Sequence, residues 1–213
     1  MTTHTRTRIK VCGITSLQDA NAAIDAGADA IGFVFVKDTP RYIEPEKAAI
    51  IMYSLPPFVG AVGVVQDLDV DQFVALEYAC PAQIMQLHGK EPIDVVCSCG
   101  PGVIKAFKYE DATINSQLTR WAKVEEVDAI LIDGSAGGTG ESFDWNALAP
   151  HIKDYPKNII IAGGLDASNV GEVIKTLRPY AVDVSTGVED APGIKNPAKI
   201  AEFCAAVRAA DAS

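Results

Sequence analysis

Short apolar segments alternate with amphipathic segments along almost the whole chain, and this alternation constrains the fold more than any other feature. The segments rich in valine, isoleucine and alanine, which we predict to be strands, are 8–13, 30–36, 59–65, 83–88, 103–108, 128–133, 158–162 and 181–186. Helical patterns lie between them at 17–26, 45–54, 70–80, 93–99, 116–123, 168–177 and 197–210. Strands that alternate with helices of this length predict βαβ units and a parallel sheet.

The number of units selects one α/β architecture. Eight units in 213 residues fit a compact (β/α)8 barrel, the TIM barrel. The alternative, a doubly wound open sheet, usually carries a glycine-rich phosphate turn after its first strand. Here Cys12-Gly13-Ile14-Thr15 stands in that place. No linker or low-complexity block interrupts the pattern, so we expect one (β/α)8 barrel domain over residues 1–213.

Composition restricts the class of protein and its partners. Hydrophobic residues make up 48% of the chain and no long apolar run exists, which predicts a soluble globular protein. The formal net charge of −10 argues against nucleic acid and anionic membrane surfaces as partners. An anionic small molecule therefore needs local stabilisation by backbone amides or by a well-placed arginine.

The N-terminal residues and the cysteines indicate which cellular compartment to expect and whether to expect a metal site. Residues 1–8 lack the apolar segment of a signal peptide, and five cysteines are too few and too scattered for a disulfide framework. We therefore expect a reducing cytoplasm. Cys97-Ser98-Cys99 has no second cysteine pair or histidine cluster to complete a four-ligand zinc site. We interpret this motif as the end of a helix and predict no metal site.

Polar side chains occupy one register of the predicted strands. Side chains alternate along a strand, so one register faces the helices and the other faces the barrel interior. The register expected to face the helices is apolar and comprises Ile9, Val11, Met85, Leu87, Ile130, Ile132, Val182 and Val184. The interior register contains Lys10, Cys12, Gln86, His88, Asp133, Asp183 and Ser185. A structural core would carry bulky branched residues there, and barrel active sites lie at the carboxyl ends of strands, so these residues predict a site.

Each of these polar residues also has a structural alternative. Cys12 stands at the end of a strand, where a thiol is placed to act as a base or nucleophile, yet free cysteine is often buried and inert. Lys10 and Gln86 are also compatible with satisfied buried polar groups. An ion pair from Lys10 to Asp133 or to Asp183 is compatible with either reading. Their concentration on the first, fourth, sixth and eighth strands favours a site.

Two glycine-bearing turns follow the seventh and eighth predicted strands. Gly163-Gly164-Leu165-Asp166 precedes a helix expected near Ser168, and at the end of the last strand Asp183-Val184-Ser185 leads into Thr186-Gly187-Val188-Glu189. Loops at these positions form the recurrent phosphate site of such barrels, because glycines let backbone N–H groups approach the anion and a helix N-terminus adds its dipole. A single Gly-Gly pair is more often a plain turn. Two turns in consecutive units predict phosphate binding by Gly163, Gly164, Ser185, Thr186 and Gly187.

Two other loops carry candidate ligand-binding features. Arg41 follows the second predicted strand in Thr39-Pro40-Arg41-Tyr42. An ordinary surface arginine is the commoner case, but its planar fork suits a substrate carboxylate. Gly137-Gly138-Thr139-Gly140 follows the sixth predicted strand. It is interpreted either as a flexible loop or as a mobile cover over the ligand.

Together these segments are closely similar to the phosphoribosylanthranilate isomerase family of tryptophan biosynthesis. The matching stretches occur in family order at 10–15, 32–35, 40–41, 62–65, 86–89, 131–133, 137–140, 143–145, 162–165 and 182–189. The resemblance implies an aldose–ketose isomerase that converts N-(5-phosphoribosyl)anthranilate to 1-(2-carboxyphenylamino)-1-deoxyribulose 5-phosphate by an acid–base Amadori rearrangement. It implies no cofactor and no metal, because the substrate's own amine and carbonyl delocalise the charge.

The resemblance also implies residue roles. Cys12 matches the family's general base, Asp133 its general acid and Arg41 its ligand for the anthranilate carboxylate. The remaining matches are substrate-pocket and phosphate-loop positions, namely His88, Asp183, Ser185, Gly164 and Gly187. Because an acid and a base must hold opposite protonation states at one pH, we expect the surroundings to raise the pKa of Asp133 and lower that of Cys12. Residues that depart from the family's common pattern, and so put its fine tuning in doubt, are Thr39, Gly134, Thr186 and Asn196.

Two other functions deserve comparison. A dual-substrate isomerase that also serves histidine biosynthesis resembles this chain, but such enzymes use paired aspartates, so Cys12 argues against it. A catalytically silent barrel that binds a phosphorylated ligand predicts loss of Cys12 or Asp133, and both residues are present. The expected partner is thus a small phosphorylated substrate, with the protein acting as a monomer or a homodimer.

Overall fold

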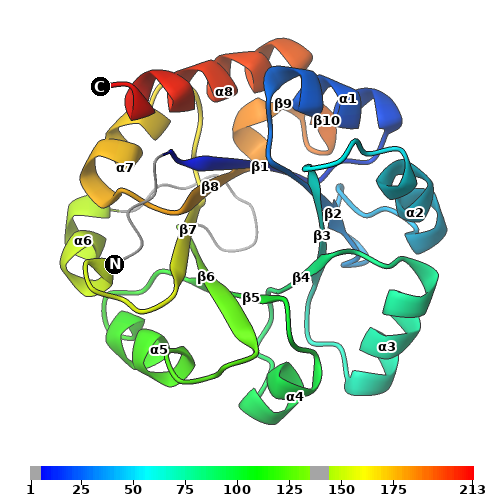
Figure 1. The fold of residues 1–213 in the computed structure, drawn as a ribbon, viewed down its shortest axis with the longest axis horizontal. Coiled ribbons are helices and arrows are strands. Elements are labelled where there is room, and N and C mark those ends of the chain that lie inside the picture. Colours follow the sequence, from blue (N-terminus) through cyan, green and yellow to red (C-terminus); the bar gives the residue numbers. More distant parts are fainter. Residues whose placement is uncertain (1–5, 135–143) are drawn as a thin grey trace.

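The computed structural model describes residues 6–134 and 144–213. Eight parallel strands form a closed barrel in sequence order, and helices surround it (Figure 1). The predicted (β/α)8 barrel is confirmed, and the open doubly wound sheet is excluded. Within these two ranges, no helix combines the length and the apolar character needed to cross a membrane. The loop 137–140 and part of the 143–145 motif lie outside the described residues.

The elements of the barrel follow the predicted order. The strands are β1 (Arg8–Cys12), β2 (Ala30–Val34), β3 (Gly60–Val65), β4 (Ile84–Leu87), β5 (Val103–Lys108), β6 (Val127–Asp133), β7 (Asn158–Ala162) and β8 (Ala181–Val184). The helices are α1 (Leu17–Ala26), α2 (Pro45–Tyr53), α3 (Val70–Ala79), α4 (Ile93–Ser98), α5 (Ile114–Trp121), α6 (Trp145–Ile152), α7 (Val170–Leu177) and α8 (Pro197–Asp211). A short helical turn, η1 (Thr186–Val188), and an antiparallel pair, β9 (Glu189–Ala191) with β10 (Ile194–Lys195), connect β8 to α8.

The sequence pattern missed one helix and the connection after the last barrel strand. Helix α6 contains Pro150, and proline weakens a helical pattern because it lacks a backbone N–H. The expected strand 181–186 ends at Val184, because Ser185 leaves the extended conformation (φ −132°, ψ −76°) and caps the start of η1. The strands β9 and β10 span only three and two residues, which is too short for a recognisable alternation.

The larger of two apolar cores lies between the barrel wall and the helices. It contains every residue predicted to face outward, and Val11, Ile132 and Val182 are completely buried there. The helices supply the other half of this core, for example through Phe203 on α8. The predicted outward register is therefore confirmed.

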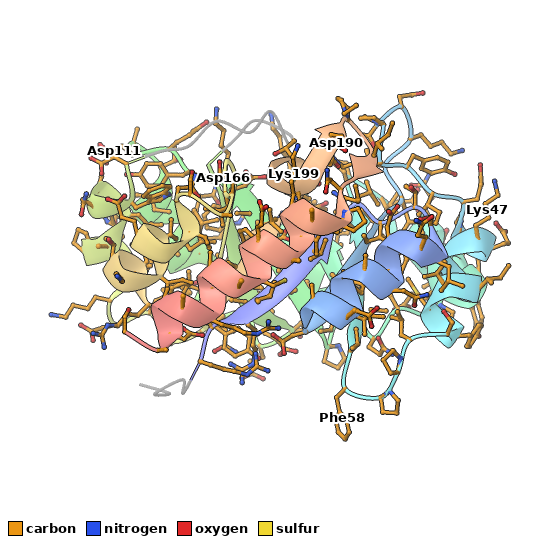
Figure 2. All side chains as sticks on the ribbon, turned by 90° about the horizontal axis from the view of Figure 1, so that it is seen from above. Lys47, Phe58, Asp111, Asp166, Asp190 and Lys199 are labelled. Carbon is orange, nitrogen blue, oxygen red and sulfur yellow. The ribbon has the colours of Figure 1, made fainter. Side chains whose placement is uncertain are left out.

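The smaller apolar core lies inside the barrel. Its residues are Val62, Ile104, Ala106, Ala129, Leu131, Ile160, Ala162 and Ala181. Towards the carboxyl ends of the strands, the interior becomes polar but stays buried, with Lys10, Gln86, Asp133 and Asp183 all at most 7% exposed. The barrel interior thus has an apolar layer, and above it, at the carboxyl ends of the strands, a polar layer. The two ends of the barrel are distinct, and Figure 2 shows Asp166 and Lys199 at the end opposite Phe58.

A buried ion pair fixes the loop that follows β4. Lys105 on β5 is 2% exposed, and its ammonium donates to Glu91 Oε2 at 2.7 Å and to three main-chain carbonyl oxygens. Glu91 Oε1 accepts from the N–H groups of Asp67 and Gly89. Burial alone would raise the pKa of Glu91, but the charge and hydrogen bond of Lys105 hold it below its ordinary value. The pair therefore joins the loops after β3 and β4 to β5.

We expect Lys105→Met to lower the free energy of unfolding by about 3–5 kcal/mol, because it leaves a buried carboxylate without its counter-ion. Urea unfolding followed by circular dichroism measures this change. Lys108→Met, at the exposed end of the same strand, is the matched control and should change stability by less than about 0.5 kcal/mol. Equal stability of the two variants would contradict the role given to the buried pair.

Candidate active site

The carboxyl ends of the barrel strands open into a cavity of about 1040 Å³. Six lining residues are the predicted catalytic and substrate-binding ones, namely Cys12, Arg41, His88, Asp133, Asp183 and Ser185. Gly163, Gly164 and Thr186 also line it, whereas Gly187 does not. The structure therefore brings together residues from both halves of the chain, as the barrel topology predicts. The cavity is large enough for a drug-sized or metabolite-sized molecule.

Cys12 ends β1 and is 7% exposed at the cavity wall. Its neighbour on β2 is Gly32, where an added Cβ would lie 2.7 Å from Cys12 Sγ. Glycine at this position thus makes room for the thiol. Gly13 then turns the chain out of the strand with a left-handed backbone (φ +79°), which glycine adopts without strain.

Lys10 lies two residues before Cys12 and faces the same interior. Its ammonium donates to Asp183 Oδ2 at 2.8 Å and to Gln86 Oε1 at 3.0 Å. Of the two ion pairs left open by the sequence, the structure forms the one with Asp183. The other carboxylate oxygen, Asp183 Oδ1, is buried and has no hydrogen-bond partner among residues 6–134 and 144–213. Because an unpaired buried acceptor is costly, this oxygen is a natural place for a hydrogen bond from a bound molecule.

Gln86 connects Lys10 to His88 and sets the tautomer of the imidazole. Lys10 can only donate, so the Gln86 carbonyl faces it, and the amide nitrogen lies 3.0 Å from His88 Nδ1. Nδ1 therefore accepts, and the ring proton resides on Nε2. This Nε2 lies 3.5 Å from Asp133 Oδ2. A continuous polar chain thus runs across the barrel from Asp183 to Asp133.

The surroundings of Cys12 favour the protonated thiol. Burial raises its pKa above the ordinary value, and the positive charges of Lys10 and Lys195 oppose this only in part. The expectation that the surroundings lower this pKa is wrong, because desolvation outweighs the lysines. Burial also acts to lower the pKa of Lys10, but attraction to Asp183 and Cys12 raises it overall, so Lys10 stays charged beside the thiol.

Asp133 ends β6 and is 6% exposed. Its register partner is Ala162 on β7, so Gly163 follows directly beside it. An added Cβ at Gly163 would lie 2.5 Å from Asp133 Oδ1 and 2.3 Å from the Gly134 nitrogen. Gly163 also has φ +88°. Both steric space and backbone conformation therefore require glycine next to the carboxyl group.

The two predicted phosphate turns lie against each other. An added Cβ at Gly187 would lie only 1.9 Å from the Leu165 carbonyl oxygen, so the loop after β8 packs directly on the loop after β7. Helix α7 begins at Val170, two residues later than expected, because Asp166 Oδ1 accepts from the N–H groups of Ser168 and Asn169 in the turn before it. The backbone N–H groups after β7 and β8 remain the candidate anion donors.

Arg41 lies at the cavity and has a partner that sequence reasoning missed. Its Nε and Nη2 donate to Glu189 Oε1 and Oε2 at 2.8 and 2.7 Å, a bidentate pair. The side chain also packs over Gly13, where an added Cβ would lie 2.6 Å from Arg41 Cδ. Arg41 is thus held next to the end of β1. Glu189 is 148 residues away in sequence, so no local pattern connects the two residues.

Lys195 is the second residue that the sequence did not single out. Its side chain is fully buried, and Nζ donates to Glu189 Oε1 at 2.7 Å. It also donates to the carbonyl oxygen and Oγ of Ser185, at 3.0 and 3.3 Å. Arg41, Glu189 and Lys195 form what we call the charge triad. Only the β9–β10 turn brings Lys195 back under the site, and nothing in the sequence distinguishes it from a surface lysine.

The possible metal-ligating side chains of residues 6–134 and 144–213 are dispersed. No group of three or more His, Cys, Asp or Glu side chains there is arranged to hold an ion. Cys97 lies in α4 and Cys99 is the residue at its carboxyl end, so the predicted helix-end assignment of this motif is confirmed.

The cavity residues, their order along the chain and the closed barrel agree with one family of known proteins. The family model described as N-(5'phosphoribosyl)anthranilate (PRA) isomerase matches residues 9–206. The chain belongs to this isomerase family. A relative named N-(5'-phosphoribosyl)anthranilate isomerase from Geotalea uraniireducens is 44% identical over 201 residues, which are 92% of this chain and 96% of the relative.

Solved structures of isomerases from the same family are similar throughout. The phosphoribosyl anthranilate isomerase from Thermus thermophilus is 38% identical with a TM-score of 0.86, and the one from Thermotoga maritima is 37% identical with a TM-score of 0.85. Each similarity covers 95% of this chain and 99% of the other. A further isomerase structure, in complex with reduced 1-(o-carboxyphenylamino)-1-deoxyribulose 5-phosphate, is 36% identical with a TM-score of 0.83 over the same shares.

Two of the departures from the common isomerase pattern, Asn196 and Thr39, make local hydrogen bonds. Asn196, where aspartate is common in the family, caps α8 by accepting from the N–H groups of Ala198 and Lys199, as an aspartate would. Thr39 Oγ1 donates to the Val36 carbonyl oxygen within the loop after β2. Thr186 begins η1. Thr39 and Thr186 themselves line the cavity, but the predicted base Cys12, acid Asp133 and Arg41 are all retained there.

Proposed function

We propose that the protein is a phosphoribosylanthranilate isomerase of tryptophan biosynthesis. The observation that carries this proposal is the placement of Cys12 on β1 and Asp133 on β6 at one cavity, next to the glycine turns after β7 and β8. A base, an acid and an anion site in one enclosure are the parts that an acid–base isomerisation of a phosphorylated sugar requires. The family membership supports the same reaction.

The substrate has two anionic ends, and the cavity offers a separate place for each. We propose that the phosphate binds backbone N–H groups at Gly163, Gly164 and the Ser185–Gly187 turn. The anthranilate carboxylate binds the free edge of the Arg41 guanidinium. The ribose then lies between Cys12 and Asp133. The related isomerase solved with reduced 1-(o-carboxyphenylamino)-1-deoxyribulose 5-phosphate supports a ligand with both groups.

The proposed chemistry needs one proton donated and one removed. The Asp133 carboxyl group donates a proton to the furanose ring oxygen, the C1–O bond breaks, and the nitrogen lone pair forms an iminium ion at C1. The Cys12 thiolate then removes the C2 proton, which gives an enolamine that tautomerises to the ketone. The proton taken by Cys12 balances the one given by Asp133, so the conversion is an isomerisation without an added reactant.

The neighbouring polar residues fit supporting tasks in this mechanism. The charged Lys10 stabilises the thiolate form of Cys12, because its ammonium lies on the same face of the barrel interior. His88 keeps its Nε2 proton directed at Asp133 through the contact with Gln86. Asp183 Oδ1, which has no partner among the residues that the structure describes, accepts from a substrate hydroxyl or amine.

A fluorescence assay tests the reaction directly. Fluorescent substrate forms in situ when a transferase joins anthranilate to phosphoribosyl pyrophosphate, and adding this protein is expected to accelerate its disappearance. The rate should increase in proportion to protein concentration and should stop on heat denaturation. If the protein binds the reduced product without accelerating substrate loss, the silent-barrel alternative is correct. A comparable rate with the phosphoribosyl substrate of histidine biosynthesis would support the dual-substrate alternative, against which Cys12 argues.

The site places no requirement on oligomeric state. Each side chain that we propose for binding or chemistry comes from one chain, so the site is compatible with a monomer or a homodimer. One related structure is described as monomers generated from a dimeric isomerase of Thermotoga maritima. A cytoplasmic location and the lack of nucleic-acid or membrane partners stay predictions.

A further inference from the structure

The charge triad carries one more positive than negative charge in a nearly closed environment. Glu189 is 8% exposed and Lys195 5% exposed, and the Arg41 side chain is 12% exposed. Burial alone would raise the pKa of Glu189, but hydrogen bonds from Arg41 and Lys195 hold it below its ordinary value, so the carboxylate is ionised. If Glu189 paired with Arg41 alone, the two charges would cancel.

The contacts of Lys195 are those of an ammonium group. An ammonium has three N–H donors and no acceptor. Around Lys195 Nζ the structure places three acceptors, which are Glu189 Oε1 and the two oxygens of Ser185. Every N–H therefore has a partner, and a neutral amine would leave one of these acceptors without a donor. The positive charge of Lys195 thus balances the negative charge of Glu189. Without Lys195, that negative charge would cancel the positive charge of Arg41.

The contacts of Arg41 leave one edge of its guanidinium toward the cavity. Glu189 occupies Nε and one N–H of Nη2, whereas Nη1 has no hydrogen-bond partner in the described part of the chain. A planar fork held along one edge presents the other edge in a fixed orientation, which is the geometry that a carboxylate recognises. The cavity lining includes Arg41 but neither Glu189 nor Lys195.

From these contacts we propose that Lys195 is a positioning residue for carboxylate recognition. It neutralises Glu189, so Glu189 can orient Arg41 without cancelling the positive charge that attracts the carboxylate of the ligand. This inference rests on the proposed function of Arg41. It assigns Lys195 no contact with the ligand, because its three donors are already used. The specificity for an aromatic carboxylate then depends on three residues, of which only one touches it.

A role of Lys195 in carboxylate recognition has different consequences from a purely structural role of the same lysine. A lysine that only fastens the β9–β10 turn to Ser185 would affect every ligand of the cavity equally. A lysine that acts through Arg41 affects only ligands that carry the carboxylate. The test therefore compares two probes, the reduced product 1-(2-carboxyphenylamino)-1-deoxyribulitol 5-phosphate and its analogue with phenyl in place of carboxyphenyl. Both keep the phosphate and the sugar chain.

Titration calorimetry on the full-length protein measures the Kd of both probes. The wild type is expected to prefer the carboxylate probe, and Lys195→Met is expected to reduce this preference by at least about tenfold, because a buried charge that orients an ion pair is lost. The Kd of the phenyl probe should change by less than about threefold. In steady-state assays, KM should rise more than kcat falls. Lys199→Met is the matched control, since Lys199 contacts the Glu189 carbonyl and Asp190 but is 43% exposed (Figure 2).

A double variant tests the same inference more strictly, through charge compensation. Adding Glu189→Gln to Lys195→Met removes the negative charge and leaves Arg41 positive again, so part of the lost preference for the carboxylate should return. A structural role predicts the opposite, because the double variant loses both buried ion pairs. Partial recovery supports the inference, and a further loss overturns it.

The outcomes separate this inference from the proposed function. If the wild type shows no preference for the carboxylate probe, the role proposed for Arg41 is wrong, and the inference fails with it. If the wild type shows the preference and Lys195→Met keeps it, only the inference is wrong. Circular dichroism checks folding of each variant. If Lys195→Met does not fold, Lys195→Gln, which keeps an N–H donor but not the charge, enters the same comparison with the same expected loss.

Discussion

Replacing Cys12 with serine is expected to lower kcat by about 10²–10⁴-fold, the range that one well-placed general base contributes. Serine keeps the shape of the side chain above Gly32, but its hydroxyl ionises far less readily than a thiol. The substrate contacts at the phosphate turns and at Arg41 are untouched, so KM should change by less than about fivefold. Steady-state fluorescence assays with saturating substrate measure both constants.

The control for this variant is another cysteine. Cys97 is partly exposed in α4 and lies outside the cavity lining, so Cys97→Ser should leave kcat unchanged. A Cys12→Ser enzyme with more than half of the wild-type kcat would contradict the role of the thiol as base. The reaction itself would still stand in that case, because the assay of the wild type tests it separately.

The raised pKa of Cys12 gives the same proposal a pH dependence. The base must be deprotonated to act, so kcat/KM rises as the pH rises through the thiol pKa of the free enzyme. Because burial raises this pKa, kcat/KM should still be increasing at the pH where an ordinary thiol is already half ionised. A plateau that begins below that pH would mean that another group is the base, or that the thiolate is stabilised more strongly than the surroundings of Cys12 indicate.

Replacing Asp133 with asparagine is expected to lower kcat by a similar factor, about 10²–10⁴-fold. The amide keeps the size of the side chain beside Gly163, but it cannot transfer a proton to the ring oxygen. Ring opening then becomes the slow step. The reduced product needs no ring opening, so its Kd, measured by calorimetry, should change by less than about tenfold.

The matched control lies on the same strand. Asp128 is exposed near the amino end of β6, and Asp128→Asn should keep both kcat and stability. Retention of full activity by Asp133→Asn would show that another acid opens the ring. Asp183 would then be the first candidate, because its Oδ1 is buried at the same cavity and has no partner within the described ranges.

The sequence predicted the barrel well because the relevant signals are local and repeated. Period-two alternation distinguished the outward from the inward register within single strands, and the burial of Val11, Ile132 and Val182 against the helices follows from that alone. The meeting of Cys12 with Asp133 at one cavity followed from topology, since parallel strands in a closed barrel all end at the same face. The roles of these two residues came from the family resemblance and remain predictions.

The parts that the sequence could not predict depend on competition between distant groups. The partner of Arg41 is far along the chain, and Lys195 reaches the site only through a turn of two very short strands. The pKa of Cys12 illustrates the same limit. The base role implied by the family resemblance required a lowered value, but the balance between the charge of Lys10 and desolvation is set by the packing of the whole barrel.

The site is assembled across the seam that closes the barrel, and this placement has a consequence for folding. Lys10 on β1 pairs with Asp183 on β8, 173 residues later, and the two strands are adjacent in register. Bringing such distant segments together has a high loop-closure entropy. A nascent chain therefore has no such site until its last strand is made and paired with its first. Any molecule that binds there stabilises the closed barrel over every opened form, in proportion to its occupancy. Ligand affinity and the stability of the pairing between β1 and β8 are thus thermodynamically linked.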